Sequence, residues 1–144
     1  MSDEAGIESV LRTWHKALTS NDGATLKGLW DQDYQGLVFI VEENNETFFD
    51  WPSIEKYYDV QTGGPDKVGW SIDNVQVGAL GDAGWGYLTF VASGRVEALK
   101  HDFVWKGRTS YILRRVGSEW KLVHYHESLS RDSSHDSWGW FFEK

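Results

Sequence analysis

The period of the hydrophobic pattern changes once along this chain, at Gly63-Gly64, and this change limits the folds that the sequence can adopt. Before it, the pattern and the flanking turn residues predict three helices, at residues 6–19, 24–30 and 51–58. After it, apolar and polar residues alternate with a period of two as far as residue 128. Helices first and strands afterwards are typical of an α+β domain rather than of repeating βαβ units. The length of 144 residues suits one such domain.

Turn and capping residues define the helix ends. Asn21-Asp22-Gly23 separates the first two helices. Asp50 is suited to cap the third helix, and Pro52 lies in its first turn, where the missing N–H costs nothing. Between the second and third helices, the β-branched and aromatic run 37–41 predicts a short strand, and residues 47–49 predict a short partner for it.

Four longer strands follow in chain order and predict an antiparallel meander. They are expected within residues 68–77, 85–92, 103–116 and 120–128. Residues 93–101 predict a loop or a short helical insertion. A curved sheet of this kind, wrapped over the helices, encloses a conical cavity between the two layers.

Charge and composition exclude several classes of partner. The formal net charge is −8 and no basic stripe is present, so nucleic acid and anionic membranes are not expected to bind. The absence of cysteine excludes disulfides and fits a cytoplasmic protein. No phosphate loop or G-x-S-x-G motif is found, and no cofactor is expected. The aromatic content is high, with 9 Trp, 6 Tyr and 7 Phe, and aromatic side chains suit both a core and the walls of a pocket.

Residues 108–128, RTSYILRRVGSEWKLVHYHES, resemble the closing hairpin of SnoaL-like proteins in the nuclear transport factor 2-like superfamily. The pattern is similar above all to the branch that contains the calcium/calmodulin-dependent kinase II association domain: an Arg-x-Thr strand, a basic pair, a Gly turn, a Trp and a V-H-x-H-x-S ending. The resemblance implies a cystatin-like α+β cone over residues 1–131, with a curved antiparallel sheet packed on three N-terminal helices. It also implies a homodimer packed sheet to sheet, and it leaves residues 132–144 as a separate aromatic tail.

The same resemblance implies which residues face the pocket. Its Arg-x-Thr row corresponds to Arg108 and Ser110 here, and the argument extends to Tyr125 and Glu127. Arg108 is expected either to clamp a ligand carboxylate or to pair with Glu127, while a purely structural pair on neighbouring strands is the alternative. Related association domains carry an arginine at the position of Glu127, so the local charge is inverted in this chain.

Candidate catalytic residues follow from residue type and position. His15 borders the apolar stripe of the first helix and is a candidate general base, or else a boundary residue with one solvated nitrogen. Glu127 is the other candidate base, with Tyr125 or Tyr34 as proton donor and Arg108 as electrostatic clamp. Aromatic side chains are expected to complete the ligand site: Trp14, Trp30, Tyr34, Tyr57 and Trp105.

Two further patterns predict an absence. His124 and His126 share one strand face, but a metal would need a third donor such as His101, and the resemblance places the pair on the outer face; no metal is expected. Ketosteroid isomerase relatives carry a carboxylate base in the strand that corresponds to residues 37–41, which here are entirely apolar. No carboxylate is therefore expected to act from that part of the chain.

The sequence supports a homodimeric protein that binds a small, partly apolar organic molecule, with isomerase, dehydratase or cyclase activity through general acid–base chemistry. The alternative is a non-catalytic association module or a ligand carrier.

Overall fold

Three helices are followed by a strongly bent antiparallel sheet, as the change of hydrophobic period predicts. The computed structural model describes residues 2–64, 68–97 and 100–130. The elements in chain order are α1 (Asp3–Thr19), α2 (Gly23–Gly28), β1 (Val38–Ile40), α3 (Trp51–Gly63), β2 (Val68–Leu80), β3 (Ala83–Val96), β4 (His101–Val116) and β5 (Glu119–Leu129). The strand order is β1-β5-β4-β3-β2, with β1 parallel to β5 and the other pairs antiparallel.

Two local predictions need correction or fall outside the described chain. Residues 93–101 were expected to form a loop or a helical insertion, but β3 continues to Val96 and β4 begins at His101, because these residues pair with each other as strands. The predicted tail, 132–144, lies outside the described residues. No helix within the described part of the chain has the length and apolar character needed to cross a membrane.

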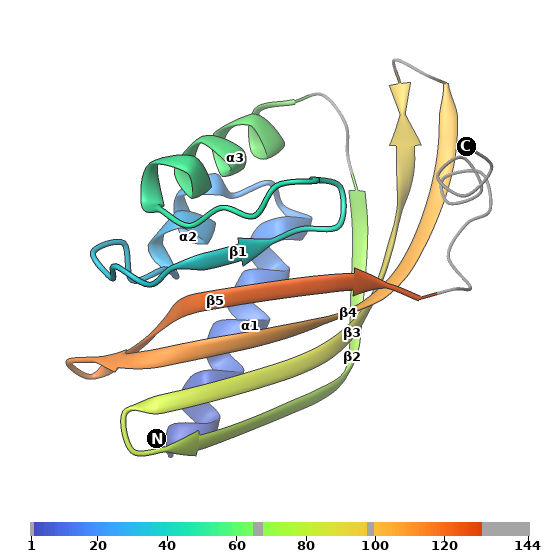
Figure 1. Cartoon of the computed structure of the whole chain (residues 1–144). Helices are drawn as coiled ribbons and strands as arrows, with labels where there is room; N and C mark the ends of the chain where they lie inside the picture. Colours follow the sequence, from blue (N-terminus) through green and yellow to red (C-terminus); the bar gives the residue numbers. More distant parts are fainter. Residues whose placement is uncertain (1, 65–67, 98–99, 131–144) are drawn as a thin grey trace.

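The helices lie on one face of the sheet, and the long strands bend around them (Figure 1). In β2 the pairing is irregular between Asp73 and Gln76, and Asn74 adopts a positive φ of 54° at this point. A bulge of this kind bends a strand and increases its twist. The bend turns the first part of β2 and the paired ends of β3 and β4 upward beside α3, as Figure 1 shows.

The core lies between α1 and the concave face of the sheet. The apolar stripe of α1 is buried there: Ile7, Leu11, Trp14, Ala17 and Leu18. The helix packs closely on β3 because the strand presents glycine at the two contact points. A Cβ atom at Gly84 would come within 2.5 Å of the Ile7 side chain, and one at Gly86 within 2.7 Å of Leu11.

A second irregularity, in the β4–β5 pair, decides which side chains of β5 face the core. Ile112 pairs with His124, but the next residue, Leu113, pairs with Leu122, so Val123 is an extra residue in β5. Such an insertion reverses the alternation of side chains along the strand. As a result, residues on both sides of the bulge are buried although their spacing is odd: Trp120, Leu122, Tyr125 and Glu127.

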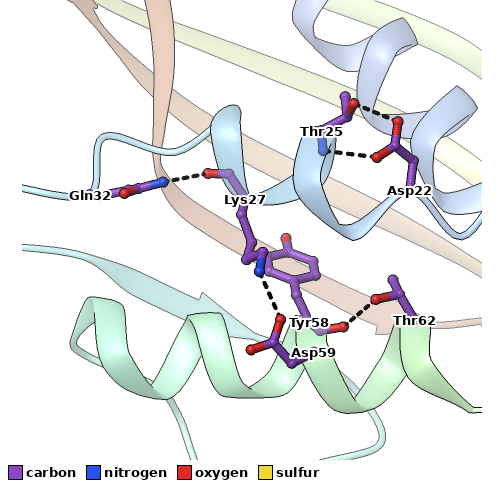
Figure 2. A network of polar contacts seen from close by, with 7 residues as sticks. All are labelled: Asp22, Thr25, Lys27, Gln32, Tyr58, Asp59 and Thr62. Carbon is purple, nitrogen blue, oxygen red and sulfur yellow. Dashed lines mark hydrogen bonds and ion pairs between the residues drawn. The ribbon is translucent and has the colours of Figure 1, made fainter.

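Polar contacts cap α2 and join it to α3 (Figure 2). The Lys27 ammonium on α2 lies 2.8 Å from the Asp59 carboxylate on α3. Asp22 caps α2 by accepting a hydrogen bond from the Thr25 backbone N–H at 3.1 Å. The Gln32 side chain donates to the Lys27 carbonyl at 3.1 Å and holds the chain as it leaves α2. The Lys27–Asp59 pair links α2 to α3, and α3 supplies one wall of the cavity described below.

Candidate functional site

An aromatic cavity of about 210 Å³ lies between the helices and the upturned part of the sheet. Its walls come from α1, α3, the short strand β1, and β2 to β5, so residues far apart in the sequence meet there. Most of the lining is apolar or aromatic. Aromatic side chains of the lining come from six elements: Trp14 from α1, Phe39 from β1, Tyr57 from α3, Trp70 from β2, Trp105 from β4 and Tyr125 from β5.

Three carboxyl groups meet at this cavity. Glu127 comes from β5, while Glu42 and Glu43 directly follow the β1 region, and one carboxylate oxygen from each lies within 4.8 Å of the others. The parallel pairing of β1 with β5, in which Ile40 lies beside His126, brings the two chain segments together. Among the described residues, this cluster is the group of donors with spacing that could hold a cation.

Two of these carboxyl groups each accept a hydrogen bond from a tyrosine. The Tyr125 hydroxyl donates to Glu127 Oε2 at 2.5 Å, and both side chains are buried. The Tyr57 hydroxyl donates to Glu43 Oε1. Glu43 is exposed as a whole residue, but its carboxylate lines the cavity. Each phenol therefore positions a carboxyl group toward the enclosed space.

Burial and the neighbouring carboxyl groups shift the protonation of Glu43 and Glu127 toward the neutral forms. Burial raises the pKa of Glu127 well above its ordinary value, and the nearby Glu42 and Glu43 add to the rise. Burial of its carboxylate, followed by the charge of Glu42, raises the pKa of Glu43 to about 7. Burial likewise raises the pKa of Tyr125, so its phenol stays protonated and keeps donating. The cavity thus holds one carboxyl group whose surroundings favour the protonated form, Glu127, next to Glu43, which exchanges its proton near neutral pH.

Three polar atoms of the cavity lining are buried without a hydrogen-bond partner in the described part of the chain. They are Glu42 Oε2, Gln61 Oε1 and Trp105 Nε1. A buried polar group without a partner costs about 1–3 kcal/mol, so such groups are rare in the interior of a protein. Their concentration around one cavity indicates a place where a ligand or water supplies the missing partners.

Five of the side chains singled out from the sequence line the cavity: Trp14, Tyr57, Trp105, Tyr125 and Glu127. Three others lie elsewhere. Trp30 is in the core, where its indole N–H donates to the Tyr58 hydroxyl at 3.0 Å. Tyr34 is 40% exposed, with the Arg114 guanidinium 5.0 Å above its ring. His15 Nε2 donates to the Trp70 carbonyl at 3.0 Å, and the imidazole is not part of the cavity wall.

The expectation that Arg108 and Ser110 face the pocket is wrong. Both are exposed on the convex face of the sheet, where Arg108 Nε donates to the Ser128 hydroxyl at 2.9 Å. The register explains the error: Thr109 pairs with Glu127, and directly paired residues project to the same face. Arg108 therefore does not pair with Glu127 and does not reach a ligand in the cavity.

Glu42, Glu43 and Gln61 were missed by sequence reasoning. Residues 37–41 carry no carboxylate, but the next two residues, Glu42 and Glu43, line the cavity. The available signal was a pair of glutamates directly after a buried apolar run, since polar residues at a strand end often belong to a site. His124 and His126 lie on the outer face, and burial, together with the charge of His126, lowers the pKa of His124.

Helices covered by a bent antiparallel sheet around an enclosed cavity define the nuclear transport factor 2-like class, and solved structures share this fold. A superfamily protein from Salmonella enterica serovar Typhimurium aligns with a TM-score of 0.77 at 16% identity, over 91% of this chain and 93% of that chain. A proposed dehydratase of the same family from Streptomyces avermitilis gives 0.76 at 15% identity, over 89% and 97%. A proposed calcium/calmodulin-dependent protein kinase II association domain from Xanthomonas campestris gives 0.72 at 16% identity, over 88% and 86%.

Within this class, the chain belongs to the SnoaL-like domain family, whose family model matches residues 7–132. A search of curated proteins found no match. The family resemblance read from residues 108–128 is therefore confirmed, and so is the α+β cone that it implies.

Proposed function

We propose that this SnoaL-like protein is a cytoplasmic enzyme that binds a small, partly apolar organic molecule in its cavity and dehydrates or isomerises it without a cofactor. The observation that carries the proposal is the position of Glu127, which is buried, hydrogen-bonded to Tyr125 and within 4.8 Å of two further carboxyl groups. Neighbouring carboxyl groups that cannot all ionise provide an acid and a base in one site.

The different surroundings of Glu43 and Glu127 suit the first to the role of base and the second to the role of acid. Glu43, whose pKa of about 7 lies near the working pH, takes a proton from a carbon next to a carbonyl group. Glu127, protonated and held by Tyr125, gives its proton to the leaving hydroxyl group, which departs as water while the carbon–carbon double bond forms. The proton taken up by Glu43 then passes to Glu127, which returns both carboxyl groups to their starting protonation states. The fold shared with a proposed dehydratase supports this assignment.

Dehydration of aryl β-hydroxy ketones tests the proposal, because the enone product is followed by its ultraviolet absorbance. A panel with neutral, aminomethyl and carboxyl ring substituents covers the three charge types. We expect turnover of at least one member, and a decrease of about 100-fold or more in Glu127→Gln, the usual effect of removing a general acid. Arg108→Ala is the control and is expected to leave turnover unchanged, since Arg108 lies on the opposite face. No turnover of any member, or equal turnover in Glu127→Gln, would contradict the proposal.

Our second proposal is that the protein forms a homodimer through the convex face of its sheet. Trp85 on β3 and Ile112 on β4 are directly paired, and they are 49% and 45% exposed in the single chain. Large apolar side chains that are neighbours on an exposed sheet face mark an interaction surface. A second copy of the chain, packed sheet to sheet, would cover them.

Ile112→Glu is expected to convert a dimer into a monomer, because it places a charge in the centre of this surface. Light scattering coupled to gel filtration measures the mass. Val60→Glu on α3, where Val60 is 70% exposed away from the sheet, is the matched control and should leave the mass unchanged. A wild-type chain that runs as a monomer at all concentrations would show that the surface has no such role.

A further inference from the structure

The charges of the cavity lining are unbalanced. Three glutamates contribute to the lining, while none of its side chains from residues 2–64, 68–97 and 100–130 belongs to Lys, Arg or His. One carboxylate oxygen of each of the three glutamates lies within 4.8 Å of the others. A ligand carboxylate or phosphate placed beside these groups would meet like charge without a compensating cation, which is costly in a poorly hydrated site.

The aromatic walls of the cavity favour positive charge. Trp14 and Trp70 lie with their ring centroids 6.3 Å apart, and Phe103 and Trp105 lie 4.8 Å apart. The faces of such rings attract cations, and indole does so best. Acidic groups combined with aromatic faces are the chemistry by which proteins recognise ammonium groups.

Two of the three buried atoms without a partner are hydrogen-bond acceptors. Glu42 Oε2 belongs to the carboxyl cluster, whereas Gln61 Oε1 comes from α3 and is an independent observation. An ammonium group has up to three N–H donors and no acceptor, so it can supply a donor to acceptors of this kind. The third atom, Trp105 Nε1, is a donor and would bind an oxygen on the body of the same ligand.

We infer that the cavity binds a small organic ammonium ion: an amine with a compact apolar body, with its charged nitrogen among Glu42, Glu43 and Glu127 and its body against the aromatic walls. The inference rests on the proposed function in one respect, that the cavity is the ligand site. The volume of about 210 Å³ corresponds to roughly seven water molecules, which suits a body of one ring.

Calorimetric titration with three compounds of similar shape tests this inference: 2-phenylethylamine, 2-phenylethanol and phenylacetate, each at pH 7. The amine is expected to bind at least about tenfold more tightly than the alcohol, and phenylacetate is expected not to bind. Glu42→Gln should reduce the affinity for the amine about tenfold and leave that for the alcohol unchanged. Glu46→Gln, an exposed glutamate outside the cavity lining, is the matched control and should bind like the wild type.

Equal affinity for amine and alcohol would overturn the ammonium inference and leave the proposed dehydration intact, because that reaction is measured separately as turnover of the hydroxy ketones. Tighter binding of phenylacetate than of the amine would overturn it as well. Amine binding that is unchanged in Glu42→Gln would place the nitrogen elsewhere and contradict the assignment. A thermal melt of each variant shows that it is folded before its affinity is compared.

Discussion

Phe39→Ala is expected to lower the free energy of unfolding by about 3–5 kcal/mol, the usual cost of removing a large aromatic side chain from a core. Phe39 is 1% exposed and lies at the centre of an aromatic group. Its ring contacts five others at centroid distances of 5.0–6.2 Å: those of Trp30, Phe48, Tyr57, Tyr58 and Tyr125. Urea denaturation followed by tryptophan fluorescence measures the change.

The same substitution is expected to weaken the site. Tyr57 and Tyr125 each donate to a carboxyl group of the cluster, and Phe39 packs against both rings. Phe49→Ala is the control, because Phe49 is 65% exposed although it is also a phenylalanine near β1. It should change stability by less than about 0.5 kcal/mol. Similar losses of unfolding free energy in the two variants would show that the aromatic group around Phe39 does not determine the stability of the core.

Glu127→Gln is expected to stabilise the protein more at pH 8 than at pH 5. The pKa of Glu127 is raised in the folded state above its ordinary value of 4.5, mainly by burial. The folded state therefore binds more protons than the unfolded state at pH values above about 4.5, and stability falls as the pH rises through this window. Glutamine does not ionise, and its amide oxygen can still accept the hydrogen bond from Tyr125.

Urea denaturation of the wild type and the variant at pH 5 and pH 8 measures this effect, since the difference between the two proteins cancels the titration of other groups. Glu46→Gln should give no such pH-dependent difference, because Glu46 is exposed and outside the cluster. A Glu127→Gln variant that is less stable than the wild type at pH 8 would mean that the buried carboxylate is stabilised by its surroundings. The expected pairing of higher stability with lost turnover is typical of a residue kept for function.

Local sequence patterns predicted only part of the carboxyl cluster and its surroundings. Glu127 and Tyr125 were predicted to face the pocket, but together with Arg108 and Ser110, and the structure separates the two pairs. Alternation within one strand states which residues share a face, but not which face is concave. The pairing of β4 with β5 places Thr109, not Arg108, opposite Glu127, and both Thr109 and Glu127 are buried on the concave face.

The sequence by itself determined the order of helices and strands and the family of the fold. Those features depend on local properties: the period of apolar residues, the capping by Asp22 and Asp50, and the turn chemistry between elements. Only the tertiary structure decided the composition of the site. The extra residue Val123 in β5 and the parallel pairing of β1 with β5 bring Glu42 and Glu43 to Glu127 across more than 80 residues of chain. Strand register and pairing partner arise from packing between distant segments, so no local pattern contains them.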